Sequence, residues 1–189
     1  MKRLVKTLLH GVFLAAAFAP ALSAGFGRVE ILYLFWAQAF AQVPGILGDY
    51  LRIAYYRLTL DECALESRIQ FGSFFAHPQV RLGRGVYIGS YCVLGRTAIG
   101  DRTQIASAVQ ILSGRRQHSR DAEGRIQGAE HGEFTSVAIG ADCWIGAAAI
   151  VMADVGAGTT VGAGSVVVKP LPPGTVAAGS PARVIKSEC

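Results

Sequence analysis

An aliphatic residue followed by a small one returns about every six residues between Val80 and Val168. The pairs are Leu82-Gly83, Ile88-Gly89, Leu94-Gly95, Ile99-Gly100, Ile105-Ala106, Ile139-Gly140, Ile145-Gly146, Val155-Gly156 and Val161-Gly162. A repeat of fixed period indicates a solenoid, in which each repeat buries its apolar face against its neighbours. The period predicts one short strand per repeat and three strands per triangular coil, with one aliphatic side chain per strand on the central axis.

The other positions of the repeat refine this prediction. Glycine or alanine in second place permits a tight corner where a Cβ would be costly, and the small residue in fifth place fills the remaining interior. Cys92 and Cys143 occupy fifth places, so we predict that both are buried core residues. The sequence has no C-x-x-C motif, which argues against a zinc knuckle or a redox pair. A reducing compartment is therefore expected.

The largest interruption of the repeat is a polar loop, residues 113–136, between Leu112 and Val137. An interruption in a solenoid maps to a loop on one face, often the binding face. Loops longer than roughly 12–15 residues without structure of their own are usually functional or disordered. This loop carries two histidines, His118 and His131. We therefore predict that it is functional.

Apolar residues are concentrated at the N-terminus. Residues 7–27 and 31–48 contain no Asp, Glu, Lys or Arg. Three interpretations compete: a signal peptide, a pair of spanning helices, and two helices lying in one leaflet, bent or ended by Pro20 and Pro44. The signal peptide is disfavoured because a second apolar segment follows. The net charge of the chain is +5, and basic residues flank the apolar segments. Such residues favour binding to an anionic cytoplasmic membrane surface. Of the two remaining interpretations, we expect the monotopic hairpin.

Between the apolar segment and the repeat, residues 48–64 are predicted to form an amphipathic helix with Arg52 and Arg57 facing outward. This helix would cap the first coil, whose uncovered edge would otherwise pair with other chains. Residues 66–78 are expected to form an imperfect first coil.

The repeats occur together with three longer phrases: Asp142-Cys-Trp-Ile-Gly146, Val161-Gly-Ala-Gly-Ser165 and Gly179-Ser-Pro-Ala-Arg183-Val-Ile-Lys186. In these features the chain resembles the hexapeptide-repeat acyltransferases, most of all the galactoside, maltose and xenobiotic acetyltransferases. The resemblance covers residues 66–187. It implies a mostly β fold, a left-handed parallel β-helix, assembled as a homotrimer with acetyl-CoA between neighbouring subunits. We expect a helical arm and cap over residues 1–60 and an acyltransferase domain over residues 61–189.

The resemblance implies that His118 is the general base that deprotonates the acceptor hydroxyl while its oxygen attacks the thioester. Imidazole suits this role because its unperturbed pKa lies near 6.5. A carboxylate or a backbone carbonyl should hold the other ring nitrogen, and Asp121, Glu123 and Glu133 are open candidates. His131 is the rival base.

Other roles near the loop are less determined. A backbone N–H of Ser113 or Gly114 is a candidate for stabilising the oxyanion. Arg115 and Arg116 suit a phosphate or carboxylate on the acceptor. His77, before Pro78, is expected to be structural or to face the acceptor.

The resemblance also implies the residues that bind CoA. The backbone of two alanines would grip pantetheine like an added strand, and three basic side chains would bind phosphates, with a valine where the family commonly has threonine. These residues are Ala147, Ala163, Val168, Lys169, Arg183 and Lys186. Trp144 either stacks against a neighbouring group or lies on the side wall of the prism.

The apolar arm, running into Gly48-Asp-Tyr-Leu-Arg52, also resembles acetyltransferases of bacterial surface-polysaccharide assembly. Together the resemblances imply O-acetylation of a sugar, glycan or lipid-linked glycan precursor in that assembly, using acetyl-CoA and no metal. The protein would work at the cytoplasmic face of the inner membrane, attached through residues 1–48, and would not bind nucleic acid. One alternative is a non-catalytic, membrane-tethered trimeric scaffold. A zinc enzyme of the carbonic anhydrase kind is disfavoured, because it needs three convergent histidines.

Overall fold

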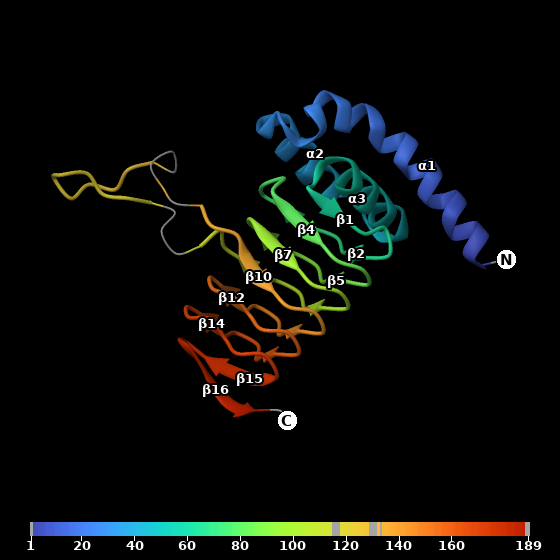
Figure 1. Ribbon diagram of the computed structural model, residues 1–189. Helices are drawn as coiled ribbons and strands as arrows, with labels where there is room; N and C mark the ends of the chain where they lie inside the picture. The colour runs from blue at the N-terminus through green and yellow to red at the C-terminus, as the bar shows by residue number, and fades with distance from the viewer. Residues whose placement is uncertain (1, 115–117, 129–131, 133, 188–189) are drawn as a thin grey trace.

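A triangular prism of short parallel strands makes up most of the molecule, and a group of helices covers its N-terminal end (Figure 1). The computed structural model describes residues 2–114, 118–128, 132 and 134–187. Up to β15, successive strands and bridges belong to three sheets in rotation, and each pairs in parallel with its neighbour one coil away. This arrangement agrees with the left-handed parallel β-helix expected from the sequence.

Each sheet forms one side of the prism. Sheet A contains β1 (Glu62–Cys63), β4 (Val80–Leu82), β7 (Thr97–Ile99) and β10 (Val137–Ile139). Sheet B contains β2 (Arg68–Ile69), β5 (Tyr87–Ile88), β8 (Gln104–Ile105), β11 (Trp144–Ile145), β13 (Thr160–Val161), β15 (Thr175–Gly179) and β16 (Ala182–Ser187). Sheet C contains β3 (Phe74–Phe75), β6 (Val93–Leu94), β9 (Gln110–Ile111), β12 (Ile150–Val151) and β14 (Val166–Val167).

The two ends of the prism differ. Beyond β10, Val155 and Leu171 continue sheet A as single parallel bridges, so the compressed repeat after Val151 keeps its place in the coil. At the C-terminal end β16 folds back antiparallel on β15. The helices close only the opposite end.

The interior follows the predicted pattern. In sheet B, Ile88, Ile105 and Ile145 lie in register on consecutive coils and are fully buried. Full burial of such a side chain contributes about 1.5–3 kcal/mol. Cys92 and Cys143 are buried in their fifth places, as predicted.

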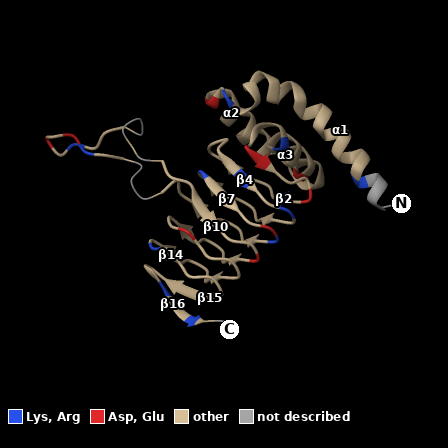
Figure 2. Ribbon diagram, in the orientation of Figure 1, with Lys and Arg blue, Asp and Glu red and all other residues tan. Residues whose placement is uncertain are grey.

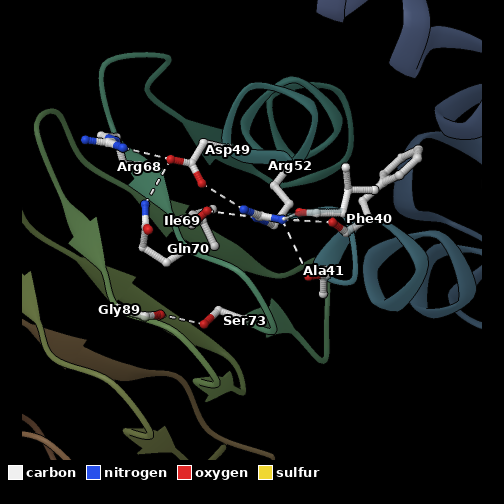
Figure 3. A network of polar contacts seen from close by, with 10 residues as sticks. Phe40, Ala41, Asp49, Arg52, Arg68, Ile69, Gln70, Ser73 and Gly89 are labelled. Atoms are coloured by element: carbon white, nitrogen blue, oxygen red, sulfur yellow. Dashed lines mark hydrogen bonds and ion pairs between the residues drawn. The ribbon is translucent and has the colours of Figure 1, made fainter. Parts of the chain in front are cut away.

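Serine and threonine in fifth places also tie consecutive coils together. The Ser73 hydroxyl donates to the carbonyl oxygen of Gly89 at 2.6 Å (Figure 3) and accepts from the backbone nitrogen of Cys92 at 2.8 Å. Both partners lie one coil further along the prism. The hydroxyl therefore satisfies two backbone groups that would otherwise be buried without a partner.

Glycine in second place has a different role from the predicted one. A Cβ on Gly146 would collide with the backbone nitrogen of Ala163 in the next coil. The left-handed conformation occurs two residues later, at Ala148 with φ 57° and, one coil on, at Gly164 with φ 67°. Close stacking of the coils therefore selects the second-place glycine, and the fourth place makes the turn.

The helical cap consists of α1 (Lys2–Ser23), η1 (Gly25–Gly27), α2 (Glu30–Ala41) and α3 (Gly45–Thr59). Helix α3 contacts β1 and β2, α2 contacts β3, and α1 packs along α3 (Figure 1). Three fully buried tyrosines fill the space within the cap and above the first coil: Tyr33, Tyr55 and Tyr56. The Tyr56 hydroxyl accepts a hydrogen bond from the backbone nitrogen of Phe75 at 3.1 Å, which fixes the cap to β3.

Two predictions for residues 48–64 are wrong. The helix ends at Thr59, and Glu62–Cys63 is strand β1, because Cys63 pairs with Leu82 of β4. Arg52 faces inward and is fully buried, whereas Arg57 is exposed as predicted.

A set of backbone carbonyls explains the burial of Arg52. Its Nε donates to Ile69 at 2.8 Å, and its Nη1 donates to Phe40 at 2.9 Å and to Val43 at 2.8 Å (Figure 3). Its Nη2 pairs with Asp49 Oδ1 at 2.8 Å. The guanidinium thus caps the C-terminal end of α2 and joins it to α3 and to the first coil, a favourable place for a cation.

Candidate functional site

The polar loop leaves the prism at the corner between sheets C and A, which we call the C–A corner (described residues 76–79, 95–96, 112–114, 118–128, 132, 134–136, 152–154 and 168–170). The backbone nitrogen of Leu112 donates to Val151, and that of Met152 donates to Val167. Leu112, Met152 and Val168 therefore stack along this corner on consecutive coils. The predicted cofactor residues Val168 and Lys169 thus lie on the same corner as the root of the loop.

Residues 118–128 of the loop form a narrow hairpin that projects from the prism (Figure 1). Arg120 and Ile126 form an antiparallel bridge. Asp121 Oδ1 accepts hydrogen bonds from the backbone nitrogens of Glu123 and Arg125 and so shapes the tip. The hairpin gives His118 a defined backbone environment.

His118 is exposed on this hairpin, and its Nδ1 lies 3.2 Å from the carbonyl oxygen of Gln127. The tautomer with hydrogen on Nδ1 donates to that carbonyl and leaves a lone pair on Nε2 as an acceptor. The orienting group is therefore a backbone carbonyl, one of the two predicted types. Asp121 is occupied with the turn instead, and Glu133 lies outside the described residues. No residue-type pattern could have indicated Gln127, because its contribution comes from the main chain.

The root of the loop is tightly built. Ser113 is buried, and its hydroxyl accepts from the backbone nitrogen of Arg96 at 2.8 Å. The backbone nitrogen of Gly114 donates to the carbonyl of Leu112 at 2.8 Å, so this N–H is already engaged in the structure. The returning strand is held where the nitrogen of Thr135 donates to the carbonyl of Ser113 at 3.1 Å. The role of a Ser113 or Gly114 N–H toward the oxyanion stays a prediction.

An aromatic and basic stack beside the loop root was missed by sequence reasoning. The Phe134 ring lies 5.5 Å from the His77 ring, and the Arg96 guanidinium carbon lies 5.3 Å from the Phe134 centroid. Burial, then the Arg96 charge, lowers the pKa of His77, whose Nδ1 is 3.9 Å from Glu30 Oε1 of α2. This stack anchors the returning strand and gives His77 the structural role that the sequence allowed. His131, Arg115 and Arg116 lie outside the described residues.

The two predicted cofactor alanines lie at the corner between sheets B and C, which we call the B–C corner (residues 70–73, 89–92, 106–109, 146–149 and 162–165). Ala147 and Ala163 are both exposed in third places of consecutive coils. The Ala147 carbonyl accepts from the nitrogen of Gly164 at 2.8 Å, so that one backbone group of Ala147 is already used. Small side chains leave this corner accessible.

The predicted phosphate-binding cations are split between two places. Arg183 and Lys186 are exposed on β16, where Arg183 pairs with Ala178 near the B–C corner (Figure 2). Lys169 is exposed on the C–A corner. Sheet C separates the two corners, so a single prism does not bring these three cations together.

Trp144 points outward from sheet B and is 60% exposed, which fits a side-wall residue. Among the described residues, no group of three or more His, Cys, Asp and Glu side chains is arranged to hold a metal ion. His77 and His118 in particular do not form such a group.

Comparison with known proteins gives a consistent result at the level of fold. No family model matches the chain, and no curated protein matches it. A hexapeptide-repeat acetyltransferase from Vibrio cholerae O1 biovar eltor, solved with acetyl coenzyme A, is 25% identical with a TM-score of 0.70. The match covers 85% of this chain and 88% of that one.

Two further solved structures extend the comparison. A maltose O-acetyltransferase from Clostridium difficile 630 is 24% identical over 85% of this chain and 89% of that one, with a TM-score of 0.69. A polySia-specific acetyltransferase is 25% identical over 65% of this chain and 58% of that one, with a TM-score of 0.55. The structural neighbours of the chain are therefore hexapeptide-repeat acetyltransferases, as the resemblance in the sequence predicted.

Proposed function

We propose that this hexapeptide-repeat chain transfers an acetyl group from acetyl-CoA to a hydroxyl of a sugar, glycan or lipid-linked glycan precursor in bacterial surface-polysaccharide assembly. The observation that carries the proposal is the match over 85% of the chain to an acetyltransferase solved with acetyl coenzyme A. This match supports acetyl transfer in general. The acceptor class rests on the names of the maltose and polySia acetyltransferases and on the sequence resemblance.

The geometry of His118 supports direct transfer. With Nδ1–H donating to the carbonyl of Gln127, Nε2 accepts the proton of the acceptor hydroxyl. The acceptor oxygen bonds to the thioester carbon, the carbon–sulfur bond breaks, and the departing sulfur takes the proton from Nε2. The products are an O-acetyl ester and CoA. Ser113, at the buried loop root, is the proposed source of the N–H that receives the oxyanion.

The placement of the predicted residues favours a site completed by a second copy of the chain. Ala147, Ala163 and Arg183 follow the B–C corner, whereas His118 and Lys169 belong to the C–A corner on the far side of sheet C. A neighbouring prism would place its B–C corner beneath the projecting hairpin. We therefore propose a homotrimer with CoA in each groove between subunits.

The outward face of the cap supports attachment to a membrane. On α1, Leu8, Val12, Phe18 and Leu22 are 50–64% exposed, while small residues such as Ala17 face the cap interior. A surface helix normally turns its large apolar side chains toward the core and its polar side chains toward solvent. A large exposed apolar patch therefore marks an interaction site. Little of the α1 ribbon has the colour of charged residues in Figure 2.

By length and composition, residues 6–23 of α1 are able to cross a bilayer. The contacts between α1 and α3 instead favour a helix that lies in one leaflet with its outer face in lipid. We propose that the protein is bound in this way at the cytoplasmic face of the inner membrane.

A coupled assay tests the transferase proposal. Purified protein, acetyl-CoA and candidate glycan acceptors are mixed, and released CoA is measured with a thiol reagent. His118→Ala is expected to abolish acceptor-dependent release, whereas Arg125→Ala, an exposed change on the same hairpin, is expected to leave it unchanged. Full activity of His118→Ala would refute the assigned base. Absence of CoA binding by calorimetry would favour the scaffold.

A further inference from the structure

A cavity of about 300 Å³ lies away from the proposed acetyl-transfer site, between α1, α3 and the first turn from sheet A to sheet B. Its volume is at the lower end of the range for ligand sites. Lys6 and His10 of α1 line one wall, Tyr50 of α3 another, and Leu65 and Arg68 the side toward the prism. Neither the acetyl-transfer mechanism nor the core of the cap uses this space.

Asp49, the carboxylate among the described lining residues, already accepts three hydrogen bonds. Asp49 Oδ1 accepts from Arg52 Nη2 at 2.8 Å, and Oδ2 accepts from Arg68 Nη2 at 2.8 Å and from Gln70 Nε2 at 2.9 Å (Figure 3). The positive charge of the buried Arg52 guanidinium is enough to balance the negative charge of Asp49, and Arg68 adds a second positive charge. Asp49 therefore offers little to a ligand. Glu66 also acts on His10 and opposes the effect of Lys6, but the charges of Lys6 and Arg68 together exceed it, so the cavity keeps an excess of positive charge.

Hydrogen-bond donors remain for a ligand. Lys6 brings an ammonium group to the lining, and the Arg68 side chain is 61% exposed with only one of its donors engaged by Asp49. His10 Nδ1 is buried without a hydrogen-bond partner, and a buried polar atom of this kind is costly unless something binds it. Burial, followed by the Lys6 charge, lowers the pKa of His10. A phosphate oxygen would satisfy the imidazole as a donor and relieve the repulsion between cations.

The rest of the lining is apolar and leads to an exposed apolar surface. Ile46 lines the cavity and is 66% exposed. Its neighbour Leu47 is 62% exposed, and Leu8 and Val12 on α1 are 63% and 64% exposed. A ligand with a negatively charged head and a hydrocarbon tail matches this arrangement, because the head would contact the cationic cavity and the tail would contact the apolar surface.

We propose that this cavity binds the phosphate-bearing headgroup of one lipid molecule, with the alkyl chains lying against the exposed apolar side chains of α1 and α3. The proposal rests on the membrane contact proposed above and is independent of acetyl transfer. Such a site would fix the depth and rotation of the cap on the bilayer, which a purely apolar surface does not do.

Vesicle flotation with the full-length protein tests the site, using phosphatidylcholine vesicles with and without phosphatidylglycerol. We expect the anionic lipid to strengthen binding. Lys6→Gln should remove most of that gain, about tenfold in affinity, as expected for loss of one charge-assisted hydrogen bond. The cavity-filling Leu65→Trp should remove it as well, because the indole would occupy the space of the headgroup. Arg57→Gln and Arg28→Gln remove exposed charges outside the cavity and should change affinity less than about twofold.

Native mass spectrometry of detergent-purified protein gives the second readout, and wild type should retain one phospholipid that Leu65→Trp lacks. Equal weakening by Lys6→Gln and Arg57→Gln would show general charge attraction and overturn the proposal. Binding of inorganic phosphate as tight as that of the lipid would overturn the lipid part. Wild-type behaviour of Leu65→Trp, with unchanged circular dichroism, would exclude the cavity.

Discussion

Replacement of Arg52 by leucine should destabilise the helical cap by about 3–5 kcal/mol, the usual cost of removing one partner from a buried ion pair. In the structure three short hydrogen bonds from Arg52 to the carbonyls of Phe40, Val43 and Ile69 would be lost. Each buried acceptor left without a donor costs about 1–3 kcal/mol. Asp49 keeps Arg68 and Gln70 as partners, which holds the total within that range.

Tryptophan fluorescence during urea unfolding provides the assay. The chain has two tryptophans, Trp36 in α2 and the exposed Trp144 on sheet B. In a Trp144→Phe background, Trp36 reports on the cap alone. With an m-value of about 1–3 kcal/mol/M, the midpoint should fall by about 2 M. Arg52→Lys should lose most of the stability as well, because a lysine cannot bond several carbonyls in a fixed fork.

Arg57→Leu is the matched control, since Arg57 lies on the same helix but is exposed. It should change the free energy of unfolding by less than about 0.5 kcal/mol. If Arg52→Leu unfolds within 1 kcal/mol of wild type, roughly the effect of an ordinary substitution, the guanidinium does not join α2 to the prism as described.

Two further predictions concern stability. Burial raises the pKa of Cys63 from 9.0 to about 12; since the folded state then keeps a proton that the unfolded state releases, stability should fall as pH rises from about 9 to 12. In thermal melts between about pH 9 and 12, Cys63→Ala should weaken the dependence of stability on pH. An unchanged dependence would show that the Cys63 thiol is not its cause. Gly146→Ala should cost about 1–3 kcal/mol through its clash with Ala163, whereas Gly11→Ala, with open space around it, should add up to about 1 kcal/mol. Equal melting temperatures for both variants would contradict the close stacking of coils.

The repeat made most of the fold predictable. Aliphatic residues such as Ile105 and the fifth-place Cys92 are buried as expected, because the same position recurs in register one coil away. Arg52 was misplaced because its burial depends on carbonyls at and beyond the end of α2 and in β2, which no local pattern reveals. Strand β1 was assigned to a helix for the same reason, since its pairing with β4 outweighs local propensity.

The candidate site was predictable only in part. The loop and His118 stand out as a polar interruption with a histidine. The group that orients His118 is the main chain of Gln127, and the stack of His77, Phe134 and Arg96 joins segments from different coils. Both depend on how the loop returns to the prism, which the sequence pattern does not describe.

The strand that folds back at the C-terminus has a consequence for solubility. A β-helix that stopped at β15 would present unpaired backbone groups to solvent, and a second molecule would find there a template for its own strands. By covering sheet B in the opposite direction and carrying Arg183 and Lys186, β16 works against end-to-end polymerisation. Removal of residues 182–187 would expose the edge of β15 to pairing of this kind.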